Sequence, residues 1–177
     1  EYLEGNDLAD ELDRTGPFEV ERAVTTILEA CDAIAEAHAS GIVHRDLKPA
    51  NLFLARNVSG QISVKVLDFG ISKFIHAAEG AAITANKALT NPATMLGSPL
   101  YMSPEQMKAS SDVDARSDLW SLGVILYELL SGHSPFDAKT VPMICAAVLG
   151  QTPAPIEGPS VPLGLQRVVF RCLEKDP

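Results

Sequence analysis

The chain has 177 residues, 46% of them hydrophobic, which is enough to bury the core of one domain of ordinary size. Its 23 acidic residues outnumber its 14 basic residues, and the net charge of −9 argues against nucleic acid or an anionic membrane as the main partner. The three cysteines lie far apart and show neither metal-ligand nor disulfide-framework spacing, which favours a reducing cytoplasm. No apolar run reaches the length of a membrane-spanning helix, and no signal peptide is visible.

Two helices are expected in the first forty residues. Asn6 or Asp7 is a candidate N-cap for a short helix over Leu8–Leu12. The segment Glu19–Ser40 predicts a long amphipathic helix, because its apolar residues recur mostly three or four positions apart. His38 on this helix is expected to be a packed histidine in the core or at its edge, since no second metal-type residue lies at helical spacing from it.

A polar loop follows this helix. The stretch His-Arg-Asp-Leu-Lys-Pro-Ala-Asn at 44–51 holds a carboxylate, two cations and a carboxamide between two apolar runs. Pro49 prevents an ordinary helix through this stretch. Catalytic residues are often carried by polar loops held between buried elements, so the stretch is a candidate catalytic loop.

Two short strands, Leu52–Ala55 and Ile62–Leu67, are expected to form a hairpin directly after the loop. The open end of this hairpin would bring Asn51 and Asp68 together. Their oxygens could hold Mg²⁺, and with Asp46 they could orient a hydroxyl for phosphoryl transfer.

The second half of the chain predicts a long loop and three helices. The apolar residues show no regular period over Ile71–Met102, and Ala77–Asn91 is expected to be a mobile surface loop. Asp118–Leu130 is apolar almost all round and predicts a buried helix, and further helices are expected over Val141–Leu149 and Leu163–Leu173. Four residues of the last helix are expected to face inward: Leu165, Val168, Val169 and Cys172.

The loop at 44–51 and the later Asp68-Phe69-Gly70 resemble the catalytic loop and the metal-binding loop of the eukaryotic-type protein kinases. The segment Gly97–Glu105 resembles the peptide-positioning loop and the closing Ala-Pro-Glu motif of that family. Here Ser98 stands for the commoner Thr, and Ser103 stands for Ala. The catalytic-loop and metal-binding-loop motifs occur in the order found in the family, and further matches follow downstream. This combination favours the interpretation that the loop is catalytic over the alternative of a polar loop that matches by chance.

The branch of the family is indicated by Lys48, two residues after Asp46, because tyrosine kinases usually lack a lysine there. The segments Leu-Lys-Pro-Ala-Asn (47–51) and Met-Ser-Pro-Glu-Gln (102–106) look closest to bacterial serine/threonine kinases of the eukaryotic type.

The resemblance covers essentially the whole chain, but only part of the family's catalytic domain. It implies a hinge at 1–8, a helical lobe at 9–177 and an activation segment at 68–105. The implied fold is α+β overall, a mainly α-helical C-lobe with a small β-hairpin at the catalytic cleft and the N-lobe missing. The Gly-rich loop, the strand lysine and its partner glutamate are expected to precede Glu1 in a longer parent protein, active as a whole although this chain alone is not.

The resemblance assigns the chemistry to four residues. Asp46 would accept or orient the proton of a protein Ser or Thr hydroxyl, and Lys48 would contact the transferring phosphate of ATP. Asn51 and Asp68 would ligate the Mg²⁺ that accompanies the nucleotide. The implied partners are therefore ATP, Mg²⁺ and protein substrates.

Nucleotide binding outside the phosphates is also implied by position. The Glu1 carbonyl and the Leu3 N–H would meet the adenine edge, Asp7 would lie near the ribose, and Phe53 would form the floor under the adenine ring. Plain core packing remains an alternative for Phe53, as helix capping does for Asp7.

Regulatory and substrate-positioning roles are implied for further residues. Arg45 resembles the arginine that pairs with a phosphorylated activation loop, for which Thr90 and Thr94 are candidate sites. The alternative for Arg45 is a purely structural role, as a salt bridge to a nearby carboxylate. Ser98 would help to position a peptide substrate. Asp118 is expected to accept backbone N–H bonds from the catalytic loop, with a simple charge effect at a helix N-terminus as the alternative.

Two other functions stay open. Small-molecule phosphotransferases of the aminoglycoside or choline type share a catalytic Asp and Asn loop on a related fold, although the segment 97–105 and the helix 118–130 favour a protein substrate. A pseudokinase, acting only as a binding module, is the second alternative, and it depends on residues that would precede Glu1.

Overall fold

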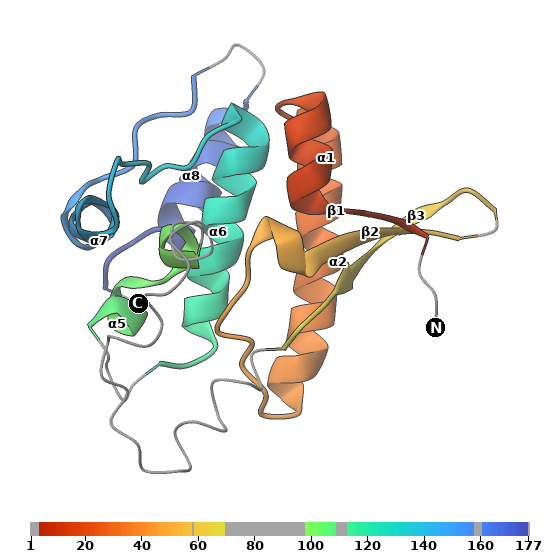
Figure 1. Cartoon of the computed structure of the whole chain (residues 1–177), viewed down its shortest axis with the longest axis horizontal. Coiled ribbons are helices and arrows are strands. Elements are labelled where there is room, and N and C mark those ends of the chain that lie inside the picture. Colours follow the sequence, from red (N-terminus) through yellow and green to blue (C-terminus); the bar gives the residue numbers. More distant parts are fainter. Residues whose placement is uncertain (1–3, 58, 70–97, 109–112, 158–160, 177) are drawn as a thin grey trace.

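The computed structural model describes residues 4–57, 59–69, 98–108, 113–157 and 161–176. Figure 1 shows a mainly helical molecule with one small sheet at its side. This combination of many helices with a small antiparallel sheet matches the α+β expectation. No helix within the described ranges combines the length and apolar character that a bilayer crossing requires.

The sheet has three antiparallel strands in the order β1-β2-β3: β1 (Gly5–Asp7), β2 (Leu52–Arg56) and β3 (Ile62–Val66). In the register, Leu54 of β2 lies opposite Asn6 of β1 and Val64 of β3. The hairpin β2–β3 is confirmed within one residue at its boundaries. The strand β1 is an addition, because three residues without apolar alternation give no strand signal.

The first two helices, α1 (Leu8–Thr15) and α2 (Val20–Ala39), lie beside the sheet (Figure 1). The α1 helix runs three residues further than expected and ends at Gly16, whose φ of 71° is the left-handed conformation that glycine adopts without strain. Helix α2 matches the predicted amphipathic helix almost residue for residue, and its buried face includes Ala23, Ile27 and Ile34.

The centre of the helical part is α6 (Arg116–Ser131), which is buried along almost its whole length, as predicted. Helices α2 and α8 (Leu163–Cys172) both pack against it. Gly123 of α6 allows a close approach to α8, because a Cβ at this position would lie 2.5 Å from the Cβ of Cys172. The helix ends at Gly132 in the left-handed region.

The inward face predicted for α8 is wrong at Val168, which is 55% exposed, whereas Val169 is fully buried. Leu165 is only partly buried, and Cys172 is intermediate. A strip around Val169 meets α6, and Val168, the preceding position, points away from it, because successive residues are 100° apart on a helix.

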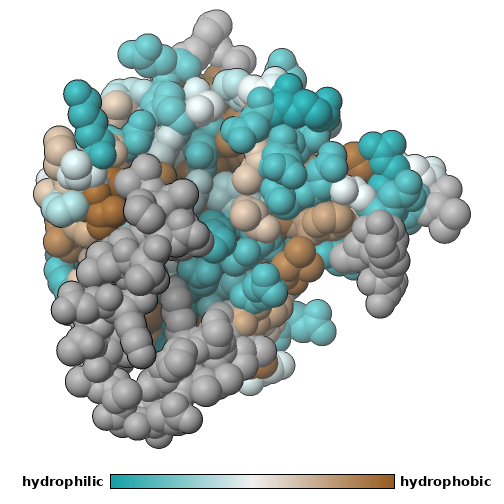
Figure 2. Space-filling view, in the orientation of Figure 1, coloured by the Kyte–Doolittle hydropathy of each residue, from teal (hydrophilic) through white to brown (hydrophobic). Residues whose placement is uncertain are grey.

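Three shorter helical elements complete the described part: the 3-10 turns η1 (Pro49–Asn51) and η3 (Ser98–Tyr101), and helix α5 (Pro104–Met107). None was predicted, since four residues carry no periodic pattern. Helix α7 (Val141–Gly150) was predicted within one residue. Figure 2 shows hydrophobic residues on the left of this face, in the region of α7. Two apolar residues of α7, Met143 and Leu149, are exposed.

Candidate functional site

The candidate catalytic loop connects α2 to β2, and Asn51 closes it. Pro49 opens the η1 turn, in which the Asn51 N–H donates to the Lys48 carbonyl at 2.9 Å. The Asn51 side chain is 6% exposed, and its Nδ2 donates to the Asp46 carbonyl at 2.8 Å. This bond uses the nitrogen end of the carboxamide, so the oxygen Oδ1 is the end left for a cation.

The hairpin brings Asp68 to this loop, as predicted. The Leu67 N–H donates to the Asn51 carbonyl at 2.8 Å, so Asp68 follows a residue that is bonded directly to the loop. Among the described residues, Asp68 (φ 51°) and Arg45 (φ 64°) are the two non-glycine residues with a positive φ. Such conformations cost roughly 1–3 kcal/mol and persist only where the surroundings impose them.

His44 is a buried link between the two loops that the sequence did not single out. Its Nε2 lies 2.9 Å from the Leu67 carbonyl, and its Nδ1 accepts the Asp46 N–H at 3.3 Å. These two bonds fit the tautomer that carries the ring proton on Nε2. The centroid of the His44 ring also lies 5.0 Å from the centroid of the Phe69 ring. Its place at the start of the polar loop was the only available signal.

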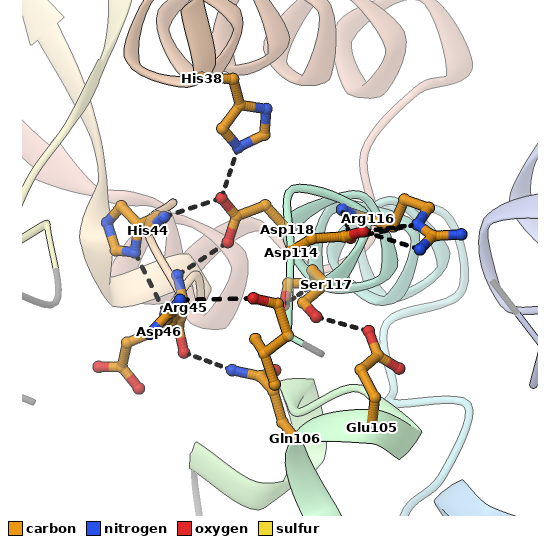
Figure 3. Close-up of polar contacts among 12 residues, drawn as sticks. His38, His44, Arg45, Asp46, Glu105, Gln106, Asp114, Arg116, Ser117 and Asp118 are labelled. Atoms are coloured by element: carbon orange, nitrogen blue, oxygen red, sulfur yellow. Dashed lines mark hydrogen bonds and ion pairs between the residues drawn. The ribbon is translucent and has the colours of Figure 1, made fainter. Parts of the chain in front are cut away.

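Asp118 at the start of α6 holds the loop backbone. Its side chain is fully buried, with Oδ2 accepting the His44 N–H at 2.9 Å and Oδ1 accepting the Arg45 N–H at 2.8 Å (Figure 3). The prediction that Asp118 accepts backbone bonds from the catalytic loop is therefore confirmed.

His38 is at the edge of the packed region, as expected, with a 19% exposed side chain. Its partner was not predicted from the sequence: the Nε2 of His38 lies 2.7 Å from the Oδ2 of Asp118 (Figure 3). Since 80 residues separate the two, no spacing rule along the chain reveals the pair.

Asp46 and Lys48 lie next to each other, with the lysine Nζ 3.3 Å from the aspartate Oδ2. Both side chains are about a quarter exposed, at 24% for Asp46 and 27% for Lys48. A carboxylate and an ammonium group therefore face the same partly open side of the loop. The Arg45 guanidinium donates to the Val113 carbonyl at 3.4 Å.

The segment 98–107, which contains η3 and α5, is also bonded to helix α6. Ser103 caps α5, and the α5 residue Glu105 accepts a hydrogen bond from the Ser117 hydroxyl of α6. The Ser121 hydroxyl donates to the Tyr101 carbonyl at 2.8 Å. Helix α6 therefore holds the catalytic loop through Asp118 and the 98–107 segment through two serines.

The remaining predicted residues lie at the edge of the described part or outside it. Asp7 caps α1 by accepting the Asp10 N–H at 2.9 Å, so the capping role is confirmed and the ribose role stays a prediction. Phe53 is half-buried in β2, opposite Asp7 and Lys65. Ser98 begins η3, and nothing is described of its side chain. The predictions for Glu1, Leu3, Thr90 and Thr94 fall outside the described ranges, and so do Gly70, Gly97 and the expected surface loop Ala77–Asn91.

The comparisons with known proteins agree with this geometry. The model of the protein kinase domain family matches residues 1–177, so the chain belongs to the protein kinase domain family. Serine/threonine-protein kinase PknB of Mycobacterium leprae is 38% identical over 181 residues, and PknB of Mycobacterium tuberculosis is 37% identical over 179; each alignment covers 100% of this chain and 27% of the relative. Serine/threonine-protein kinase Pkn1 of Myxococcus xanthus is 41% identical over 163 residues, covering 91% of this chain and 22% of the relative. The chain thus spans about a quarter of the length of these curated relatives.

Proposed function

We propose that the chain is the hinge and helical lobe of a serine/threonine protein kinase, whose parent protein transfers the γ-phosphate of ATP to Ser and Thr hydroxyls of proteins. The observation that carries this proposal is the loop itself: Asp46, Lys48 and Asn51 stand on a backbone fixed by Asp118, directly beside Asp68. The serine/threonine kinase relatives support the substrate class.

The proposed domain is incomplete within this chain. The hinge is assigned to 1–8, the helical lobe to 9–177 and the activation segment to 68–105. The described residues contain a single three-stranded sheet, and none of its strands precedes the proposed hinge. The nucleotide-covering lobe, with its Gly-rich loop and lysine, is therefore proposed to come from the preceding part of the parent.

Asp46 is proposed as the residue that accepts or orients the proton of the substrate hydroxyl. Its useful state is the carboxylate, and the Lys48 ammonium lies 3.3 Å from one of its oxygens. Lys48 is also proposed to approach the transferred phosphate as a compact point charge. Both side chains are part-exposed, so a bound substrate can reach them.

The side chains of Asn51 and Asp68 fit Mg²⁺. Asn51 presents its Oδ1 because Nδ2 is bonded within the loop, and Asp68 presents an exposed carboxylate. Two hard oxygen donors suit an ion that takes its other ligands from phosphates and water. When bound, the ion would neutralise negative charge on the phosphate oxygens.

The rest of the ATP site is proposed to use the Glu1 carbonyl, the Leu3 N–H, Asp7 and Phe53. Phe53 and Asp7 face each other across β1 and β2, so one short stretch of sheet could contact both base and ribose. The nucleotide is therefore proposed to lie at the end of the sheet where β1 leads into α1, close to the η1 turn that contains Asn51.

Substrate positioning and control are proposed for a second set of residues. Ser98 would lie along the peptide, and Arg45 would pair with a phosphate on Thr90 or Thr94. A cytoplasmic location is proposed for this domain, because an ATP-dependent kinase with unpaired cysteines suits a reducing compartment. A membrane anchor elsewhere in the parent is compatible with this.

The test is phosphotransfer by the purified parent protein, with labelled ATP and Mg²⁺. A Ser/Thr peptide library should accept label on hydroxyls. Transfer only to an aminoglycoside or choline acceptor would instead support the small-molecule phosphotransferase. Nucleotide binding without transfer to any acceptor would support the pseudokinase.

A further inference from the structure

The carboxamide of Gln106 makes two hydrogen bonds that serve different segments. Its Oε1 accepts the Ser103 N–H at 3.0 Å, which completes the capping box of α5. Its Nε2 donates to the Arg45 carbonyl at 2.8 Å, across 61 residues of sequence (Figure 3).

The capping box uses only half of this side chain. In such a box the third helical residue has to supply an acceptor, and Glu serves as well as Gln. The amide nitrogen of Gln106 is therefore surplus to the cap. This nitrogen instead donates to the carbonyl of Arg45, the residue immediately before Asp46.

Arg45 is held at both backbone groups by side chains from other segments. Its N–H is bonded to Asp118 of α6, and its C=O is bonded to Gln106 of α5. Its φ of 64° is a conformation that a non-glycine residue keeps only when its surroundings impose it. The peptide bond clamped in this way between Arg45 and Asp46 sets the direction in which the Asp46 side chain leaves the loop.

We propose that Gln106 is a positioning residue, which ties the end of the proposed activation segment to the backbone of the catalytic loop and so fixes the orientation of Asp46. This inference rests on the proposed kinase function and goes beyond it, by naming the physical link between the peptide-positioning segment and the catalytic carboxylate. Helix α5 is itself fixed to α6 through Glu105 and Ser117, so the link runs from a rigid support.

The test uses Gln106→Glu in the full-length parent protein. Glutamate keeps the acceptor for the Ser103 N–H and loses the donor to the Arg45 carbonyl, so capping is preserved while the link is cut. Gln106→Ala removes both bonds. The matched control is Gln166→Glu in α8, where Gln166 Nε2 donates to the Val161 carbonyl at 3.4 Å; the charge change and the type of lost bond are the same, away from the loop.

We expect Gln106→Glu and Gln106→Ala to lower kcat for peptide phosphorylation about tenfold or more, since a small displacement of a catalytic group is enough for such a loss. The KM for ATP should stay within about twofold, because both backbone groups of Arg45 are bonded to Asp118 and Gln106 and neither belongs to the proposed nucleotide site. Gln166→Glu should keep the kcat of the wild type, and melting temperatures of the two glutamate variants should match.

If the wild type is active and both Gln106 variants keep its kcat, the inference is overturned while the proposed function stands. It is equally overturned if kcat falls only in proportion to the folded fraction measured by thermal unfolding. An inactive wild type would instead overturn the proposed function, and the inference with it.

Discussion

At the scale of single residues, the candidate site depends on backbone geometry as much as on side-chain chemistry. The proposed catalytic residues, Asp46, Lys48 and Asn51, could be singled out because they lie within one short polar stretch. The residues that hold them were harder to find. The backbone bonds of Asp118 were predicted from the family resemblance, whereas the bonds of Gln106 and His38 were not predicted, because their partners lie 61 and 80 residues away in the sequence.

Asp46→Ala should lower phosphotransfer by the parent protein roughly 10²–10⁴-fold, the usual contribution of a positioned base. The control is Asp32→Ala, which removes an exposed carboxylate on α2. Both variants should be compared with the wild type in autophosphorylation and peptide assays. Equal rates for Asp46→Ala and the wild type would remove Asp46 from the mechanism.

Asp68→Asn should weaken ATP binding only when Mg²⁺ is present, because the carboxylate is proposed to act through the ion. Calorimetric titration of the parent with ATP, in Mg²⁺ and in a chelator, measures the difference. The affinity without metal should be the same for the variant and the wild type. A variant that keeps the full Mg²⁺ effect would contradict the assignment of Asp68.

At the scale of elements, the long and strongly patterned helices were predicted nearly to the residue, and the short elements were not. Helices α2 and α6 carry clear periods over many turns, whereas β1, η3 and α5 have four residues or fewer. Their conformations are set by pairing with β2 and by bonds to α6, which are tertiary effects. The wrong orientation of Val168 has the same cause, since only the position of α6 decides which strip of α8 is covered.

Gly123→Ala should destabilise the contact between α6 and α8. The new Cβ would lie 2.5 Å from the Cβ of Cys172, closer than packed carbon atoms approach, so one helix must shift. Overpacking of this kind costs about 1–3 kcal/mol in the free energy of unfolding. The control is Gly164→Ala in α8, where no atom lies within 4 Å and a gain of up to about 1 kcal/mol is expected. Denaturant unfolding of both variants is the measurement, and a Gly123→Ala protein as stable as the wild type would contradict the packing.

The contact between α1 and α2 should make stability depend on acid pH through Glu11. Hydrogen bonds from Arg22 and then Arg14 hold the pKa of this buried carboxyl below its usual range. A lowered folded-state pKa means that the stabilisation is complete above the unfolded-state pKa, about 4.3, and is lost as the pH falls through the folded-state value. Because both arginines are partly exposed, we expect about 1 kcal/mol.

Unfolding of the Glu11→Gln variant should therefore lose less stability than the wild type between neutral pH and pH values below the usual carboxyl range. Urea unfolding across this range measures the difference. Parallel curves for the two proteins would show that Glu11 does not contribute.

At the scale of the whole molecule, two groups of elements meet along the catalytic loop: the sheet with α1 and α2, and the helices around α6 (Figure 1). The core is continuous across them, since Leu8 and Leu52 on one side belong to the same buried cluster as Ile125 and Leu129 on the other. A shared core predicts that the chain unfolds as one unit. The proposed site lies at the surface where these groups meet, and its nucleotide side is proposed to be covered by residues that this chain does not contain.

The isolated 177-residue chain should therefore fold cooperatively, bind ATP weakly and show no turnover, whereas the parent is proposed to be active. Folding is expected from the buried α6 and the helices packed on it. No turnover is expected because the proposed nucleotide-covering lobe, which would hold the phosphates in line for transfer, is assigned to the preceding part of the parent. Exposed apolar residues such as Met143 and Leu149 make association at high concentration a further expectation. Thermal unfolding, calorimetry with ATP and Mg²⁺, and a phosphotransfer assay should be run on the chain and the parent side by side, with sedimentation to follow association. Turnover by the chain at the rate of the parent would refute the proposal that a preceding lobe is required, because Asp46, Lys48, Asn51 and Asp68 would then suffice by themselves.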